Sequence, residues 1–227
     1  MRKGLVVMMT LSLALVAFSC TPGGIIVLDA GDHADIVEGV IGNSGEIITI
    51  LATPTVEQLL SAARQVPAIG SSTNTSIKYV LDLLPELEGW LADIPGETLQ
   101  AIDEIIYNVT QLETVPAATD FLQDAIDSHQ YDDYEWLPEA LEFGIDLLEA
   151  GENTIYSPGW APYAEEPLVG FNVSQLWKKD LEGGIAGAVG CALAGDAPEQ
   201  YAVGIGGVVG GVDSSMANLI SQLTEWW

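Results

Sequence analysis

The chain has very few basic residues. Its 227 residues include 33 Asp and Glu but only 6 Lys and Arg, which gives a formal net charge of −27 at pH 7. A nucleic-acid binder needs a basic surface to meet the phosphate backbone, and this chain cannot form one. The composition therefore excludes nucleic acid as a partner.

Cysteine and histidine are also scarce, with two of each. Two cysteines cannot form a disulfide framework, and two histidines leave little for histidine-based catalysis or a zinc site. The sequence contains no G-x-S-x-G, P-loop or H-E-x-x-H motif. No residue stands out as catalytic, so we expect a protein that is not an enzyme and uses no cofactor.

What the chain does contain is enough apolar sequence to fold. Apolar residues make up 48% and charged residues only 17%. This mixture can bury a core and is unlike a disordered acidic tail. We expect one domain, or one domain with an appendage.

The amino terminus has the three-part layout of an export signal. A basic start, Met1–Lys3, precedes an uncharged and mostly apolar stretch, Gly4–Phe18, and then Ser19 and Cys20. Fifteen apolar residues extend roughly 22 Å as a helix, too short to span a roughly 30 Å hydrocarbon core. We therefore interpret residues 1–19 as a signal peptide.

The Ala17-Phe18-Ser19-Cys20 ending resembles the lipobox of bacterial lipoproteins. The resemblance implies that Cys20 becomes the first mature residue and carries a lipid. It also implies attachment to a membrane of the bacterial cell envelope. Thr21, in place of Asp after the cysteine, favours the outer membrane by the rule of that family.

The middle of the chain, residues 55–151, is typical of an acidic bundle of amphipathic helices joined by short turns. Apolar stripes predict helices near 55–66, 77–91, 99–112, 118–126 and 137–148. Thr55 and Gln58 have the spacing of a capping box, and Thr75 or Ser76 is the expected cap of the second helix, which Pro85 should bend. Gly151 is placed to end the last helix. Residues 20–54 are predicted to be a tether and irregular segment, and residues 152–173 a linker rich in proline and aromatics.

The segment 174–227 contains small residues at every fourth position. Two runs show this spacing, the first being Gly183, Gly187, Cys191 and Gly195, and the second Ala202, Gly206, Gly210 and Ser214. Such runs form a groove that lets two helices approach closely. They predict a glycine-zipper hairpin with arms near 175–195 and 199–224. The fold class is therefore mainly α, a helical bundle with a C-terminal glycine-zipper hairpin.

Aromatic residues and lysines flank the apolar part of this hairpin, as they do at membrane interfaces. The residues are Trp177, Lys178, Lys179, Tyr201, Trp226 and Trp227. The segment is similar to the glycine-zipper tails of small bacterial envelope lipoproteins, which implies helix association at or in a membrane and supplies no enzymatic chemistry. Against a membrane span, the first arm is apolar over only thirteen residues and the second contains Asp213 and Asn218.

Two acidic clusters surround the histidines. One consists of Asp29, Asp32, His33, Asp35 and Glu38, and the other places His129 near Asp127, Asp132, Asp133 and Glu135. Neither has the spacing of a calcium loop, and no metal ligand is nominated; a solvated face is the favoured interpretation of both. His129 continues an apolar stripe and is predicted to be a core histidine at a helix end. Cys191 has no basic neighbour in the sequence and is predicted to be an inert packing residue.

These patterns lead to two hypotheses of function. The first is a non-enzymatic, lipid-anchored cell-envelope protein whose hairpin mediates helix packing, self-association or membrane contact. Its partners would be a membrane, through the lipid, and a second copy of the chain, through the hairpin. The alternative is a calcium- or small-ligand-binding module in which the hairpin is soluble core.

Overall fold

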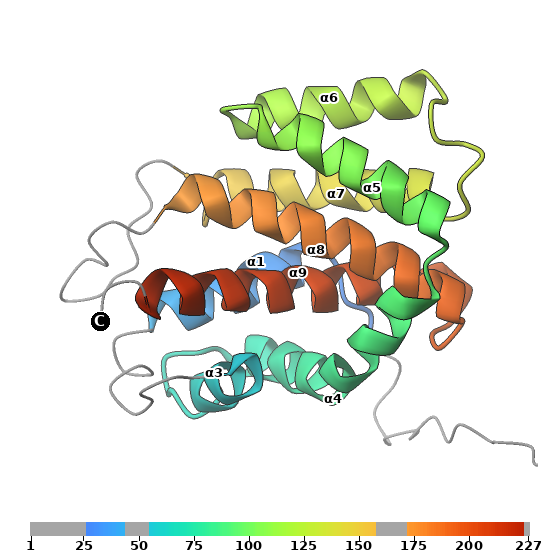
Figure 1. Cartoon of the computed structure of the whole chain (residues 1–227). Helices are drawn as coiled ribbons and strands as arrows, with labels where there is room; N and C mark the ends of the chain where they lie inside the picture. The colour runs from blue at the N-terminus through green and yellow to red at the C-terminus, as the bar shows by residue number, and fades with distance from the viewer. Residues whose placement is uncertain (1–25, 44–54, 158–171, 225–227) are drawn as a thin grey trace, which may run out of the picture.

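The computed structural model describes residues 26–43, 55–157 and 172–224. Cys20, Trp226, Trp227 and most of the predicted linker lie outside these residues. The described ranges hold eight helices and no strand, which confirms the mainly α prediction (Figure 1). The helices are α1 (Ala30–Gly42), α3 (Val56–Ala63), α4 (Ser71–Asp93), α5 (Gly96–Thr110), α6 (Val115–Asp127), α7 (Leu137–Glu152), α8 (Val173–Ala194) and α9 (Glu199–Thr224).

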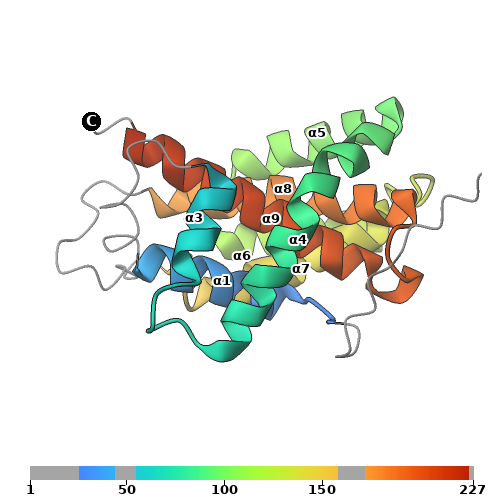
Figure 2. The same ribbon diagram turned by 90° about the horizontal axis from the view of Figure 1, so that it is seen from below.

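The two C-terminal helices form an antiparallel hairpin at the centre of the bundle. Helices α4, α5 and α7 pack against α8, and helices α1, α3, α4 and α7 pack against α9. Figure 1 shows α5 and α6 above the hairpin and α3 and α4 below it. Figure 2, seen from below, shows α3 and α4 crossing in front of α9. The hairpin is therefore the middle of a single hydrophobic core that all the described helices share.

Helix starts follow their sequence signals where a side chain is available to cap them. Thr55 and Gln58 form the expected reciprocal capping box at the start of α3. Helix α4 begins at Ser71, earlier than the prediction of a cap at Thr75 or Ser76. Thr75 instead donates its hydroxyl to the Ser71 carbonyl at 2.9 Å, and Ser76 donates to Asp32 Oδ1 of α1 at 2.7 Å. Both hydroxyls are used inside the helix, which is why neither marks its start.

Helix α1 corrects the prediction of an irregular tether over residues 20–54. Asp29 caps it, accepting from the Asp32 backbone while Asp32 Oδ2 accepts from the Asp29 backbone N–H. These two acids thus satisfy backbone donors at a helix start. Seven of the thirteen residues of α1 are buried, and they pack on α7 and α9.

Helix α7 ends one residue after Gly151. Gly151 lies inside the helix, which continues to Glu152, whereas the sequence predicted that it ends the helix. A side chain at Gly151 would overlap the ring of Tyr156, whose backbone N–H donates to the Gly151 carbonyl at 2.9 Å. Gly151 therefore provides space for Tyr156 and does not act as a helix stop.

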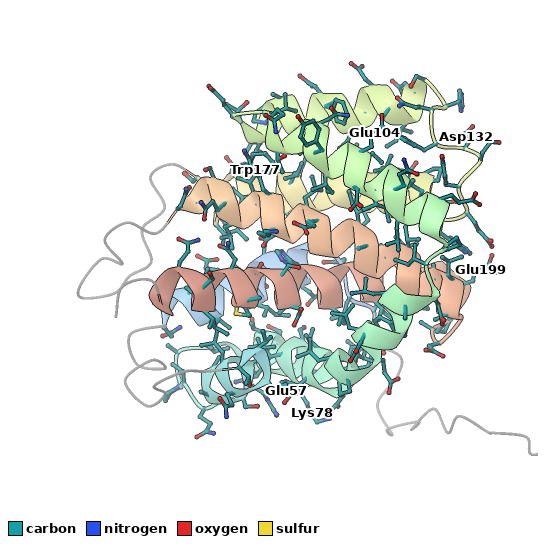
Figure 3. The ribbon with its side chains drawn as sticks, viewed as in Figure 1. Glu57, Lys78, Glu104, Asp132, Trp177 and Glu199 are labelled. Atoms are coloured by element: carbon teal, nitrogen blue, oxygen red, sulfur yellow. The ribbon has the colours of Figure 1, made fainter. Side chains whose placement is uncertain are left out.

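The surface of the bundle is acidic. Figure 3 shows Glu57, Glu104, Asp132 and Glu199 around its outside. The few cations are engaged locally: Lys78 pairs with Asp82 at 2.9 Å, and Lys179 with Glu182 at 2.6 Å. Both pairs are about half exposed, so they leave most of the surface charge unbalanced.

Candidate functional site

The facing sides of α8 and α9 meet backbone to backbone. A Cβ built on Gly187 would overlap the Gly206 carbonyl oxygen, and one built on Gly206 would overlap the Gly187 carbonyl oxygen. Gly183 and Gly210 have the same reciprocal relation one turn further along. The absence of four side chains therefore sets the distance between the two helices.

The other small residues of the two runs do not all share this role. Cys191 and Ala202 are both buried, and a Cβ on Gly206 would overlap the Cβ of Cys191. The Ser214 hydroxyl lies over Gly183. Gly195 is different, because it ends α8 with φ +70° and faces open space. Its predicted packing role is corrected to that of a C-cap, since only glycine adopts that conformation without strain.

The thiol of Cys191 is unreactive at neutral pH. Burial raises its pKa to about 12, with a smaller contribution from the charge of Asp196. The thiol therefore stays protonated at neutral pH, and thiolate is the reactive form.

The outward-facing grooves of the hairpin are filled by other helices and by the segment before α1. Phe143 of α7 lies over Gly207, and Leu147 of α7 lies over Gly184. A Cβ on Gly190 would lie 2.8 Å from the Trp90 carbonyl oxygen, and one on Gly204 would lie 2.6 Å from that of Leu28. Each of these grooves is occupied by a part of the same chain.

Among the described residues, the predicted interface anchors do not form a surface belt. Trp177 is 2% exposed and belongs to the core, which corrects its predicted place at a membrane interface. Lys178 donates to the Thr110 carbonyl at 2.6 Å, and its ammonium lies 5.2 Å from the centre of the Trp177 ring. Tyr201 is partly buried and packs against the core. These side chains attach α8 and α9 to the rest of the bundle.

A buried polar network crosses the bundle beside the glycine contact. Asp180 of α8 is fully buried and accepts from Tyr156 Oη at 2.7 Å through Oδ2 and from Ser215 Oγ through Oδ1. His33 of α1 is also fully buried, with its Nε2 atom 3.4 Å from Ser215 Oγ and 3.7 Å from Asp180 Oδ2. The network thus joins α1, α8, α9 and the turn after α7.

The network is electrically neutral near pH 7. Burial raises the pKa of Asp180 to about 8, although the hydrogen bonds from Ser215 and Tyr156 act in the opposite direction. Burial lowers the pKa of His33 to about 4, opposed by a hydrogen bond to the backbone of Gly211. Burial also raises the pKa of Tyr156, and the charge of Asp180 adds to this shift. Each group therefore keeps its uncharged form in the interior.

The presence of Ser, His and Asp does not make this network a catalytic triad. In a triad the acid orients one ring nitrogen of the histidine while the other nitrogen activates the serine. Here Ser215 and Asp180 both face Nε2 of His33, and Nδ1 has no hydrogen-bond partner. Ser215 is also fully buried. The arrangement holds helices together and does not expose a nucleophile.

Sequence reasoning missed this network, although one signal for it was available. Asp180 stands four residues after Leu176 and four before Gly184, in line with buried positions of α8. A carboxylate on the buried stripe of an otherwise apolar helix indicates a buried polar contact. His33 gave a misleading signal, because its acidic neighbours along the chain favoured a solvated face.

The second histidine, His129, is exposed where the sequence predicts a buried position. The side chain of His129 is 78% exposed and pairs with Asp132 at 2.8 Å, so the prediction of a core histidine was wrong. Helix α6 ends at Asp127, and His129 has a left-handed φ of 54°, which turns it away from the helical stripe. Among the described residues, no group of three or more His, Cys, Asp or Glu side chains is arranged to hold a metal ion.

A hollow of about 280 Å³ lies at the start of α7. Its lining residues are Asp132, Tyr134, Glu135, Trp136, Pro138 and Glu139. Trp136 precedes α7 with a left-handed φ of 65°. The hollow is open, acidic and partly aromatic.

Within the described residues, one helix has the length and composition of a membrane span. It is the Glu199–Gln222 part of α9, with a mean hydropathy of 1.3, and 61% of its most apolar stretch is buried in the bundle. A central helix of a soluble protein meets the same criteria. Comparison of the chain with protein-family models, curated proteins and solved structures finds no match.

Proposed function

We propose that the chain is a non-enzymatic, lipid-anchored protein of the bacterial cell envelope. The glycine-zipper hairpin organises its acidic helical domain, and a lipid on Cys20 attaches that domain to the membrane. The observation that carries the role of the hairpin is its occupation by its own chain, and the lipid on Cys20 rests on the lipobox-like sequence at 17–20. The inner glycines contact one another, and Phe143, Trp90 and Leu28 cover outer ones.

Of the three roles considered for the hairpin, this arrangement favours helix packing within the chain over self-association and membrane contact. Self-association or membrane contact through the same glycines would require the surrounding helices to leave first. Their departure would expose much of one shared core, which is costly at roughly 25 cal/mol per Å² of apolar surface. Helix packing within the chain is therefore the role that we assign to the hairpin.

The charge of the mature chain supports attachment by a lipid. Cleavage before Cys20 would remove Arg2 and Lys3 and leave 4 basic against 33 acidic residues, a net charge of −29. Such a surface is repelled by anionic lipid headgroups. The domain therefore needs a hydrophobic anchor, and more than one acyl chain for stable binding.

The lipid on Cys20 is tested by metabolic labelling with a fatty-acid analogue in a bacterial host, followed by membrane fractionation. The wild-type chain should take up label and sediment with membranes, whereas Cys20→Ser should do neither. Cys191→Ser is the matched control and should keep the label, because it leaves Cys20 in place and removes only a buried cysteine. An unlabelled wild-type chain, or a labelled Cys20→Ser chain, would contradict the proposal.

A ligand-binding module is the second candidate, favoured by the hollow at the start of α7. Its carboxylates and aromatic rings suit a small cationic ligand or a hydrated cation. A ligand that binds only the folded protein raises the melting temperature. Titration with Ca²⁺ should leave the melting temperature unchanged if the lipid-anchored role is the whole function. A saturable rise that Glu135→Gln abolishes would favour the second candidate.

A further inference from the structure

The buried network provides a polar contact between α1 and the central hairpin. His33 comes from α1, Asp180 from α8 and Ser215 from α9, while Tyr156 comes from the turn after α7. We propose that this network is a proton-dependent latch that holds α1 against the hairpin and loosens it as the pH rises. The proposal is independent of the lipid on Cys20.

The fold makes room for these polar side chains with glycine. A Cβ on Gly211 of α9 would lie 2.9 Å from Cδ2 of His33, and a Cβ on Gly151 would overlap the Tyr156 ring. His33 and Tyr156, two of the four side chains of the network, therefore occupy space that a side chain at Gly211 or Gly151 would fill. A buried polar group costs stability unless it is hydrogen-bonded, so its retention in a core that glycines open for it favours a specific role.

The hydrogen bonds of the network meet at the carboxyl group of Asp180. Tyr156 donates to Oδ2 and Ser215 donates to Oδ1, while Nε2 of His33 lies 3.4 Å from Ser215 Oγ. Ionisation of Asp180 leaves a fully buried carboxylate. His33 stays uncharged near neutral pH and supplies no positive charge that balances the carboxylate.

Among the described residues, no Lys or Arg pairs with Asp180. On α8 itself, Lys178 is bonded to the Thr110 carbonyl of α5, and Lys179 to Glu182. The groups that face Asp180 from packed elements are His33 from α1, Tyr156 from the turn after α7 and Ser215 from α9. Asp213, two residues before Ser215 on α9, has its pKa raised by burial and adds no positive charge. Tyr79 of α4 interacts with Cys191, about three turns along α8 from Asp180.

The direction of the pH effect follows from the two shifted groups. Asp180 has a folded pKa of about 8, above its ordinary 3.8, so its contribution to stability is lost as the pH rises between these values. His33 has a folded pKa of about 4, below its ordinary 6.5, so its effect is opposite between pH 4 and 6.5. The two effects cancel over that lower range. A net loss of stability remains between pH 6.5 and 8.

Helix α1 is the element that should loosen first. It is thirteen residues long and enters the network through His33 alone. Helices α8 and α9 remain joined by their glycine contact, and Tyr156 is held beside α7 by hydrogen bonds of its turn. The weakened contact is therefore the one between α1 and the hairpin.

The test is hydrogen exchange of the full chain at pH 6.5 and pH 8.5, corrected for the intrinsic pH dependence of exchange. In the wild-type chain, the opening equilibrium of α1 should increase about tenfold per pH unit between 6.5 and 8, the linkage expected for one proton. Asp180→Asn mimics the protonated acid and should show no such increase. Asp103→Asn, at an exposed acid of α5, is the matched control and should behave as wild type. Equal increases in the wild-type and Asp180→Asn chains would overturn the proposal.

A second measurement needs no variant. Exposed carboxylates are ionised at pH 7, so an infrared band of a protonated carboxylic acid at that pH reports a buried acid. The wild-type chain should show this band at pH 7 and lose it by pH 9. Absence of the band at pH 7 would overturn the latch even if Asp180→Asn fails to fold.

Discussion

The glycines at the centre of the hairpin and Gly89 of the outer helix α4 have opposite effects on stability. In the hairpin, Gly187 and Gly206 face each other so closely that neither position has room for a methyl group. In α4, Gly89 is exposed and a Cβ built on it meets nothing within 4 Å. Glycine costs up to about 1 kcal/mol relative to alanine in a helix. Backbone contact between α8 and α9 offsets this loss of stability in the hairpin, whereas no contact offsets it at Gly89 of α4.

The largest effect should come from filling the hairpin contact. Gly187→Leu combined with Gly206→Leu places two side chains where the partner backbone lies, and the helices must separate. The loss should be comparable to the whole stability of a domain, roughly 5–15 kcal/mol. Far-ultraviolet circular dichroism and urea titration measure it. A cooperative transition at the wild-type midpoint would show that the contact does not hold the fold.

A smaller loss of stability should follow from substituting Gly151, which makes room for a side chain and not for a backbone. Gly151→Ala forces the Tyr156 ring to move, which should cost about 1–3 kcal/mol as overpacking does. Urea titration measures this loss. In a Tyr156→Leu background the same substitution should cost much less, and an equal cost in both backgrounds would locate the strain elsewhere.

Removing a helix cap should cost less again. Thr55→Ala deletes the hydroxyl that accepts from the Gln58 backbone at 3.2 Å, for an expected loss of about 1 kcal/mol. The urea midpoint should fall accordingly. Thr55→Ser keeps the acceptor and should remain near wild type; if both variants lose equal stability, the cap is not the cause.

The smallest effect, and the only one of opposite sign, belongs to the outer glycine. Gly89→Ala should stabilise the chain by roughly 0.5–1 kcal/mol, because alanine restricts the unfolded chain and nothing opposes its methyl group. Thermal unfolding measures the gain. A destabilised variant would remove the contrast between the two kinds of glycine.

The same contrast explains how much of the fold the sequence predicts. The hairpin arms, expected near 175–195 and 199–224, agree with α8 and α9 to within a few residues, because a four-residue repeat is a local pattern. The stripes that predict α5, α6 and α7 are local in the same way. Which helices cover the hairpin depends on contacts between distant segments. The sequence therefore left open whether the hairpin is an appendage or part of the core, and the structure has one shared core.

The two histidines show where local pattern misleads. His33 stands among acids that predict a solvated face, yet two of those acids cap and brace α1 while the ring enters the core. His129 continues an apolar stripe, yet the helix ends before it and leaves its side chain exposed. In both cases the deciding fact is where a helix begins or ends, which hydrophobic periodicity specifies poorly.

The central claim is the proposal that the hairpin is the interior of the folded domain and that a lipid on Cys20 provides attachment to the membrane. Liposome flotation of residues 20–227 with Cys20→Ser tests it most directly, since this chain lacks residues 1–19 and has no cysteine at position 20 to carry a lipid. The account predicts that the chain stays in solution as a monomer, with its apolar α9 covered by α1, α3 and α4. A chain that floats with liposomes while its helical content is unchanged would contradict the account and make the hairpin a membrane element.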